Sequence, residues 1–335
     1  MGKRAAGSTA AGPQAAPPGG EFGIIARHFS PPVSHTMLAG GDDAALLEVS
    51  PGMALAVSTD MLVCGRHFLP DAAPAGLGHK CLAVNLSDMA AMGARPRWAT
   101  LALALPAADE GWIAAFMAGL LALARRHEVD LVGGDTTRGP LTVCIQIMGE
   151  VAAQAALRRS GARPGDDLWV SGTVGEAAAA LAALQGRAAL PPEALARART
   201  RLEQPEPRVS LGLALAGVAS ACIDLSDGLV ADVGHVAERS GVRALIQWPR
   251  VPLAPFMAHG RDDPAIRALA LAGGDDYELA FCAPPQRREA VLAAAAAAGV
   301  AVTPIGVMQA GDGVCVLDGH GAPMVVEAGG FDHFA

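Results

Sequence analysis

The chain has 335 residues, of which 52% are hydrophobic and 17% charged, a composition that excludes global disorder. At about 150 residues per domain, this length predicts two domains. The formal net charge of −8 argues against a protein that binds nucleic acid through a basic face. The chain has only two lysines, Lys3 and Lys80, and neither stands in a G-x-x-x-x-G-K-[ST] motif, which excludes a lysine-bearing P-loop.

The first half of the chain predicts a mixed α/β unit. Residues 1–20 are rich in Ala, Gly and Pro and are expected to be a disordered extension, with ordered structure starting near Glu21. Leu82, Leu86 and Met89 stand at helical spacing, and the preceding strand is expected to end at Asp60. The predicted elements are strands over 55–59, 99–105 and 141–148 and helices over 74–93 and 111–127.

The second half predicts another α/β unit, and the domain boundary is expected near residue 150, giving domains 21–150 and 151–335. An alanine-rich run ending at Gly299 is typical of a helix with a glycine cap. Four prolines between residues 191 and 207 indicate a linker or loop. The predicted elements are strands over 168–171 and 278–283 and helices over 175–185, 210–217, 227–240 and 286–298.

The six cysteines are scattered, without a C-x-x-C pair. That pattern argues against a zinc ribbon or a disulfide framework and indicates buried thiols in the reducing cytoplasm. Uncharged stretches such as 113–124 are shorter than the ~20 residues that a membrane-spanning helix needs, so no membrane association is expected.

Aspartates recur in glycine-rich turns and beside predicted strands. Taken singly, an aspartate beside glycine is most often a turn residue or a helix cap. Asp88 is harder to explain so, because it lies inside an apolar helix and a buried carboxylate needs a partner, either a metal or a hydrogen bond to a helix end or an arginine. The acids in question are Asp42, Asp43, Asp60, Asp88, Asp135, Asp224, Asp227, Asp275 and Asp276.

If several of these carboxylates converge, they need a counter-charge. Two like charges 4 Å apart repel by ~4 kcal/mol at an effective dielectric of 20. Hard oxygen ligands suit Mg²⁺, which typically binds a few carboxylates together with substrate phosphates, while glycine-rich turns offer backbone N–H groups to phosphate. The pattern therefore predicts a polyphosphate site. Arg159 could contact a phosphate or be a solvated loop residue, and His67 is by default a structural histidine.

Eight short motifs follow one another along the chain. They are 41–46 (GDDAAL), 58–63 (STDMLV), 80–94 (KCLAVNLSDMAAMGA), 131–140 (LVGGDTTRGP), 159–162 (RSGA), 223–229 (IDLSDGL), 273–279 (GGDDYEL) and 330–334 (GFDHF). Taken in this order, the motifs resemble the thiamine-monophosphate kinase family from about Glu21 to the C-terminus. That family belongs to a superfamily that includes aminoimidazole-ribonucleotide synthetase.

The resemblance implies a fold and a set of site residues. An N-terminal mixed sheet would pair with that of a second subunit in a dimeric, barrel-like core, with a C-terminal α/β domain packed against it and ATP between the two. Metal-ligand positions fall on Asp43, Ser58, Thr59, Asp60, Asp88, Asp135, Asp224 and Asp227. Nucleotide-binding positions fall on Gly134, Asp135, Arg159 and Ser226, and thiamine-side positions on His67, Asp275 and Phe331. The family commonly has Glu at position 275 and Tyr or Trp at position 331.

The resemblance also implies a reaction, in which ATP and thiamine monophosphate give ADP and thiamine diphosphate with several Mg²⁺ ions. Because a phosphate nucleophile is already ionised near neutral pH, direct in-line transfer would need positioning and charge neutralisation, and no covalent phosphoenzyme. Two alternatives stay open. One is another ATP-using enzyme of the superfamily, and the other is a module that binds metal or nucleotide without turnover.

Overall fold

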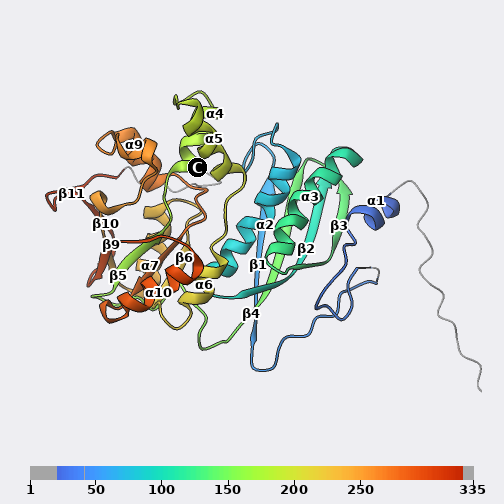
Figure 1. The fold of residues 1–335 in the computed structure, drawn as a ribbon, viewed down its shortest axis with the longest axis horizontal. Helices are drawn as coiled ribbons and strands as arrows, with labels where there is room; N and C mark the ends of the chain where they lie inside the picture. Colours follow the sequence, from blue (N-terminus) through green and yellow to red (C-terminus); the bar gives the residue numbers. More distant parts are fainter. Residues whose placement is uncertain (1–20, 41, 327–335) are drawn as a thin grey trace, which may run out of the picture.

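The computed structural model describes residues 21–40 and 42–326, in which two open sheets lie side by side with helices against them (Figure 1). The predicted extension 1–20 and the thiamine-side residue Phe331 lie outside the described residues. A short helix, α1 (Glu21–His28), precedes the first sheet.

The first sheet has four strands in the order β1-β4-β2-β3. Strand β4 is antiparallel to both β1 and β2, whereas β2 and β3 are parallel. The strands are β1 (Ala54–Val63), β2 (Arg95–Leu105), β3 (Asp130–Arg138) and β4 (Thr142–Val151). In the described part of the chain, β1 and β3 are therefore the two edges of this sheet, on opposite sides.

Helices α2 (Pro74–Ala91) and α3 (Glu110–Arg126) cover one face of this sheet (Figure 1). They cross closely, since a Cβ on Gly78 would lie 2.0 Å from the Phe116 carbonyl oxygen and one on Gly119 would lie 1.9 Å from the Ala75 carbonyl oxygen. Only glycine permits such an approach of two helix backbones. The crossing fixes α2, the helix that carries Asp88.

Successive side chains of strand β1 point to opposite faces of the sheet, and they are alternately exposed and partly buried. Ser58 and Asp60 face α2, whereas Leu55, Val57 and Met61 lie on the other face and are 45%, 51% and 57% exposed. Large apolar side chains at these exposures form an uncovered apolar face.

The second sheet has seven strands in the order β11-β10-β7-β9-β5-β8-β6. Among the described strand pairs of this second sheet, only β10 and β7 are parallel. The strands are β5 (Asp167–Ser171), β6 (Ala221–Asp224), β7 (Arg243–Gln247), β8 (Leu279–Ala283), β9 (Val302–Gln309), β10 (Gly313–Leu317) and β11 (Pro323–Met324).

Alternate residues of the second sheet enter two different cores. Trp169 and Phe281 stack in a core that continues into the first sheet, while Leu168 and Val170 pack in a core with α7. The helices of this half are α4 (Glu176–Leu184), α5 (Pro192–Glu203), α6 (Val209–Leu215), α7 (Leu229–Ser240), α8 (Pro255–Ala258), α9 (Pro264–Ala272) and α10 (Arg288–Ala298). Because α6 and β6 both contact α2, the two sheets meet around that helix.

Three predicted features of the chain differ in the structure. Strand β1 continues past Asp60 to Val63, so Asp60 lies inside a strand and not at its end. Asp135, expected in a glycine-rich turn, lies inside strand β3. The proposed linker contains helix α5, because Pro192 stands in its first turn, where its missing N–H costs nothing, and the next proline, Pro205, comes after its end.

None of the helices formed by residues 21–40 and 42–326 combines the length and the apolar character needed to cross a membrane. All six cysteines are free thiols, of which Cys81, Cys222 and Cys282 are buried as expected, whereas Cys64, Cys144 and Cys315 are only partly buried.

Candidate active site

Most of the predicted site residues line one cavity of about 910 Å³ where the two sheets meet, here called the carboxylate cavity. The first half of the chain contributes strand β1 and helix α2, and the second half contributes the loop after β6 and the loop before β8. The predicted residues in it are Ser58, Asp60, His67, Asp88, Arg159, Asp224, Ser226, Asp227 and Asp275.

Two adjacent residues of α2 hold the centre of the cavity together. The Ser58 hydroxyl on β1 donates a 2.5 Å hydrogen bond to the Asp88 carboxylate. The Ser87 hydroxyl donates a 2.7 Å hydrogen bond to the carboxylate of Asp224 at the end of β6. Helix α2 thus joins a carboxylate from each half of the chain.

Burial raises the pKa values of the central carboxylates, and at two of them repulsion from neighbouring carboxylates adds to the shift. Burial, followed by repulsion from Asp88 and Asp224, raises the pKa of Asp60 to about 7. Burial and then Asp88 raise the pKa of Asp224 to about 7. Burial also raises the pKa of Asp88, opposed by the Ser58 hydrogen bond and the positive charge of Arg159. Raised pKa values show that positive charge nearby does not balance these carboxylates. A bound cation would therefore be favoured among them.

Lys80, Asp275 and Tyr277 form a second set of polar contacts in the wall of the cavity. The Lys80 ammonium, on a side chain that is almost fully buried, lies 3.2 Å from a carboxylate oxygen of Asp275. The Tyr277 hydroxyl donates a 3.1 Å hydrogen bond to the same carboxylate. Burial raises the pKa of Tyr277 well above its usual range, so the phenol stays a hydrogen-bond donor.

An adjoining pocket of about 370 Å³, here called the apolar pocket, shares Lys80 and Asp275 with the carboxylate cavity. Leu77, Leu181 and Leu202 form part of its wall. His67 also borders both spaces, and its Nδ1 accepts a 2.9 Å hydrogen bond from the Val63 backbone N–H. A charged cavity that opens into an apolar one suits a ligand with a phosphate end and a ring system.

Asp232, a residue that the sequence does not single out, anchors the loop after β6. The Asp232 carboxylate accepts hydrogen bonds of 3.0 and 3.1 Å from the backbone N–H groups of Asp227 and Gly228. Burial, then repulsion from Asp224, raises the pKa of Asp232 to about 7. Asp232 therefore fixes the turn that carries Ser226 and Asp227.

Three predicted residues lie elsewhere. Asp43, Gly134 and Asp135 line a separate pocket of about 320 Å³ beside β3, here called the glycine pocket. Gly134, with φ at 154°, is required there because a Cβ would lie 1.8 Å from the Leu101 carbonyl oxygen. Since β3 and β1 are opposite edges of the sheet, a single chain does not bring these residues to Asp60.

Thr59 points to the other face of β1 from Ser58 and Asp60, where its hydroxyl accepts a 3.4 Å hydrogen bond from the Gln146 side chain. In residues 21–40 and 42–326 no three His, Cys, Asp or Glu side chains form a ready-made metal-binding group.

Ser87, Tyr277, Asp232 and Lys80 were not among the predicted site residues. Lys80 and Tyr277 stand inside segments that carry the resemblance, in KCLAVNLSD and GGDDYEL, so the signal was present. Asp232 carries no comparable signal in the sequence, since an aspartate in the first turn of a helix is common.

Comparisons with known proteins agree with this architecture. Residues 41–151 match the family of the AIR synthase related protein, N-terminal domain, and residues 163–318 match that of its C-terminal domain. The thiamine-monophosphate kinase of Salmonella typhimurium is 46% identical over 320 residues, which cover 94% of this chain and 98% of the relative.

Solved structures give the same result. The crystal structure of thiamine-monophosphate kinase from Stenotrophomonas maltophilia K279a has a TM-score of 0.79 and 47% identity, covering 88% of this chain and 94% of that one. AaThiL complexed with AMPPCP and TMP has a TM-score of 0.75 and 33% identity, covering 88% and 91%.

Two AIR synthase related domains in tandem define the class of protein, and the catalytic family follows from the close relatives. The chain belongs to the thiamine-monophosphate kinase family and is an enzyme of that kinase class.

Proposed function

We propose that the protein transfers the terminal phosphoryl group of ATP to thiamine monophosphate, forming ADP and thiamine diphosphate. The observation that carries this proposal is the continuity of the carboxylate cavity with the apolar pocket across Lys80 and Asp275. AaThiL supports it, because that relative, which has a similar fold, was solved in complex with AMPPCP and TMP.

The nucleotide phosphates would lie in the carboxylate cavity, near Arg159 and Ser226. The donor set of Asp60, Asp88 and Asp224 fits Mg²⁺, since all three offer carboxylate oxygens and their mutual repulsion leaves negative charge to be neutralised. Several Mg²⁺ ions bound to these residues and to Asp227 would neutralise charge on the transferred phosphoryl group. Phosphate oxygens and water would complete their coordination.

The thiamine moiety would occupy the apolar pocket. Phe68 and Leu77 offer apolar surface to its rings, and Asp275 offers a carboxylate near the cationic thiazolium. His67 borders this pocket, and the hydrogen bond that its Nδ1 accepts from the Val63 N–H helps to fix the orientation of the imidazole ring there. Phe331 remains a predicted stacking residue outside the described part of the chain.

Transfer would be direct and in-line. The acceptor phosphate is already an anion near neutral pH, so the site needs to align it and to neutralise charge. Lys80 and Arg159 both line the cavity and would supply positive charge to the phosphates. No side chain is assigned as a covalent nucleophile.

A homodimer would complete the site. The uncovered apolar face of β1 and the open edges of β1 and β3 favour pairing of β3 in one copy with β1 in another, which closes two sheets into a barrel. That pairing would bring Asp43, Gly134 and Asp135 of one copy toward Asp60 of the other. The residues that a single chain separates would then share one site.

A cytoplasmic location and a division of the chain near residue 150 are parts of the same proposal. The free cysteines support the first. The passage of the chain from one sheet to the other between β4 and β5 supports the second.

The test is a panel of acceptors with γ-labelled ATP and Mg²⁺, comprising thiamine, thiamine monophosphate and aminoimidazole precursors. We expect labelled thiamine diphosphate from thiamine monophosphate alone, with no labelled protein in a single turnover. Turnover of another acceptor in place of thiamine monophosphate would overturn the assignment, and a labelled protein intermediate would overturn direct transfer.

A further inference from the structure

Residues 273–278 form a loop whose side chains alternate between the carboxylate cavity and a buried polar network. Asp275 and Tyr277 line the cavity, whereas Asp276 and Glu278 point away from it and are 4% and 0% exposed. The φ angles of Asp275 and Tyr277 are 68° and 49°, in the left-handed region that residues with side chains seldom adopt. Such a conformation persists only where the surrounding contacts impose it.

Backbone contacts impose part of this conformation. The N–H groups of Asp275 and Tyr277 donate to the carbonyl oxygens of Ser226 and Leu225 at 2.9 and 2.8 Å. On the buried side, both carboxylate oxygens of Asp276 accept from the Gly175 N–H, at 3.0 and 2.8 Å. The loop is thereby anchored to the turn after β6 and to the start of α4.

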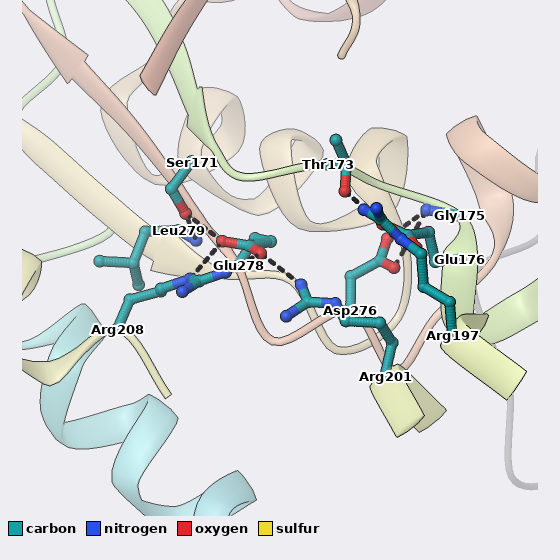
Figure 2. Close-up of polar contacts among 10 residues, drawn as sticks. All are labelled: Ser171, Thr173, Gly175, Glu176, Arg197, Arg201, Arg208, Asp276, Glu278 and Leu279. Carbon is teal, nitrogen blue, oxygen red and sulfur yellow. Dashed lines mark hydrogen bonds and ion pairs between the residues drawn. The ribbon is translucent and has the colours of Figure 1, made fainter. Parts of the chain in front are cut away.

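Glu278 supplies the strongest anchor (Figure 2). Its carboxylate accepts two hydrogen bonds from Arg208, of 2.6 and 2.5 Å, one of 2.6 Å from the Ser171 hydroxyl, and one from Arg201. Burial opposes ionisation, but Arg208 and Arg201 hold the pKa of Glu278 below its usual value. Glu278 is thus a fully buried carboxylate matched by two guanidinium groups.

Arg201 connects this anchor to the apolar pocket. It stands on α5, and the next two residues of that helix, Leu202 and Glu203, line the pocket. The ion pair therefore joins one wall of the apolar pocket to the loop that presents Asp275, which in turn lies 3.2 Å from Lys80.

We propose that Arg201 and Glu278 are positioning residues, whose buried ion pair sets Asp275, and through it Lys80, against the wall of the apolar pocket. The inference rests on the proposed function, because it assigns to this pair the placement of the groups that meet thiamine monophosphate. Neither Arg201 nor Glu278 lines the carboxylate cavity or the apolar pocket.

Arg201→Gln is the test variant, because it leaves Arg208 on Glu278, whereas Glu278→Gln would leave two arginines without their carboxylate. Arg197→Gln is the matched control, since Arg197 lies one turn earlier on α5 and pairs with Glu176 instead. We expect Arg201→Gln to raise the KM for thiamine monophosphate about tenfold and to leave the KM for ATP within about twofold. Arg197→Gln is expected to leave both KM values unchanged. Arg201→Lys is expected to raise the KM for thiamine monophosphate less than Arg201→Gln does.

A second readout needs no substrate. Hydrogen exchange at the amides of Asp275 and Tyr277 is expected to be faster in Arg201→Gln than in Arg197→Gln, with similar melting temperatures. Unchanged exchange, or faster exchange with an unchanged KM, would overturn the proposal. If the parent enzyme does not phosphorylate thiamine monophosphate, the proposed function fails, and the exchange rates alone decide whether the pair holds the loop. If Arg201→Gln does not fold, Arg201→Lys, which keeps the charge and loses the planar fork, serves the same comparison.

Discussion

At the scale of single residues, the three carboxylates of Asp60, Asp88 and Asp224 explain most of what the cavity can do. Each comes from a different element, and two of them accept hydroxyl hydrogen bonds that hold them in place. Burial raises the pKa of all three, and repulsion from neighbouring carboxylates adds to this at Asp60 and Asp224, so the metal-free cluster lowers the stability of the fold. Residues that a fold would not choose for stability alone are typical of a functional site.

Asp88→Asn tests a catalytic role for the central carboxylate. Asparagine can still accept the Ser58 hydrogen bond, and the loss of one anion relieves repulsion in the cluster, so the fold is expected to stay intact. Turnover is expected to fall by about 100-fold or more. Melting temperature and kcat are measured on the same preparation. Near-normal kcat would count against metal binding by Asp88.

The pH dependence of stability tests the raised pKa values. The pKa of Asp224 is about 7 in the folded protein against a usual 3.8, so the folded state holds a proton that the unfolded state has lost. The stability of the metal-free protein is therefore fullest at acidic pH, falls as pH rises toward about 7, and levels off above. Asp224→Asn is expected to flatten this fall in melting curves recorded with a chelator from pH 5 to 8. Equal slopes in the two proteins would contradict it.

At the scale of elements, α2 is the organising helix, because its close crossing with α3 sets where Asp88 lies. Gly119→Ala places a Cβ 1.9 Å from the Ala75 carbonyl oxygen and is expected to cost about 1–3 kcal/mol. Gly234→Ala, on α7, meets nothing closer than 3.8 Å and is expected to stabilise by about 0.5–1 kcal/mol. Chemical denaturation measures both. A Gly119→Ala protein as stable as the parent would show that the helices can separate freely.

The elements also show how far the sequence predicts the fold. Helix α2 was predicted nearly to its ends, because its apolar residues repeat at helical spacing and Gly93 follows it. Strand β3 was missed, because its Gly133 and Gly134 are typical of a turn, whereas Gly134 allows close approach to β2. Helix α5 was missed because prolines near its ends looked like a linker. In both cases tertiary packing decided the structure.

The candidate site was likewise predicted only in part. The motifs identified the acids, and the structure gathers Asp60, Asp88 and Asp224, which lie far apart in the chain, into one cavity. The separation of Asp135 from them was not predictable, because it depends on the strand order, which no local pattern encodes. Thr59 differs from Asp60 only by the alternation of a strand, yet the two lie on opposite faces.

At the scale of the whole molecule, the uncovered face of β1 connects assembly to activity. Val57→Asp places a charge on that face, and we expect a monomer by light scattering with most of the kcat lost, because the glycine pocket would no longer meet the carboxylate cavity of another copy. Leu292→Asp is the control, since Leu292 on α10 is 52% exposed, much like Val57 at 51%. A monomeric Val57→Asp protein with full activity would contradict a shared site.

The most direct test of the account is a crystal structure of the protein with Mg²⁺, a non-hydrolysable ATP analogue and thiamine monophosphate. We predict metal density against Asp60, Asp88 and Asp224, the nucleotide phosphates beside them, and the thiamine rings in the apolar pocket next to His67 and Leu77. Ligands bound away from both cavities, or carboxylates without a cation between them, would contradict it.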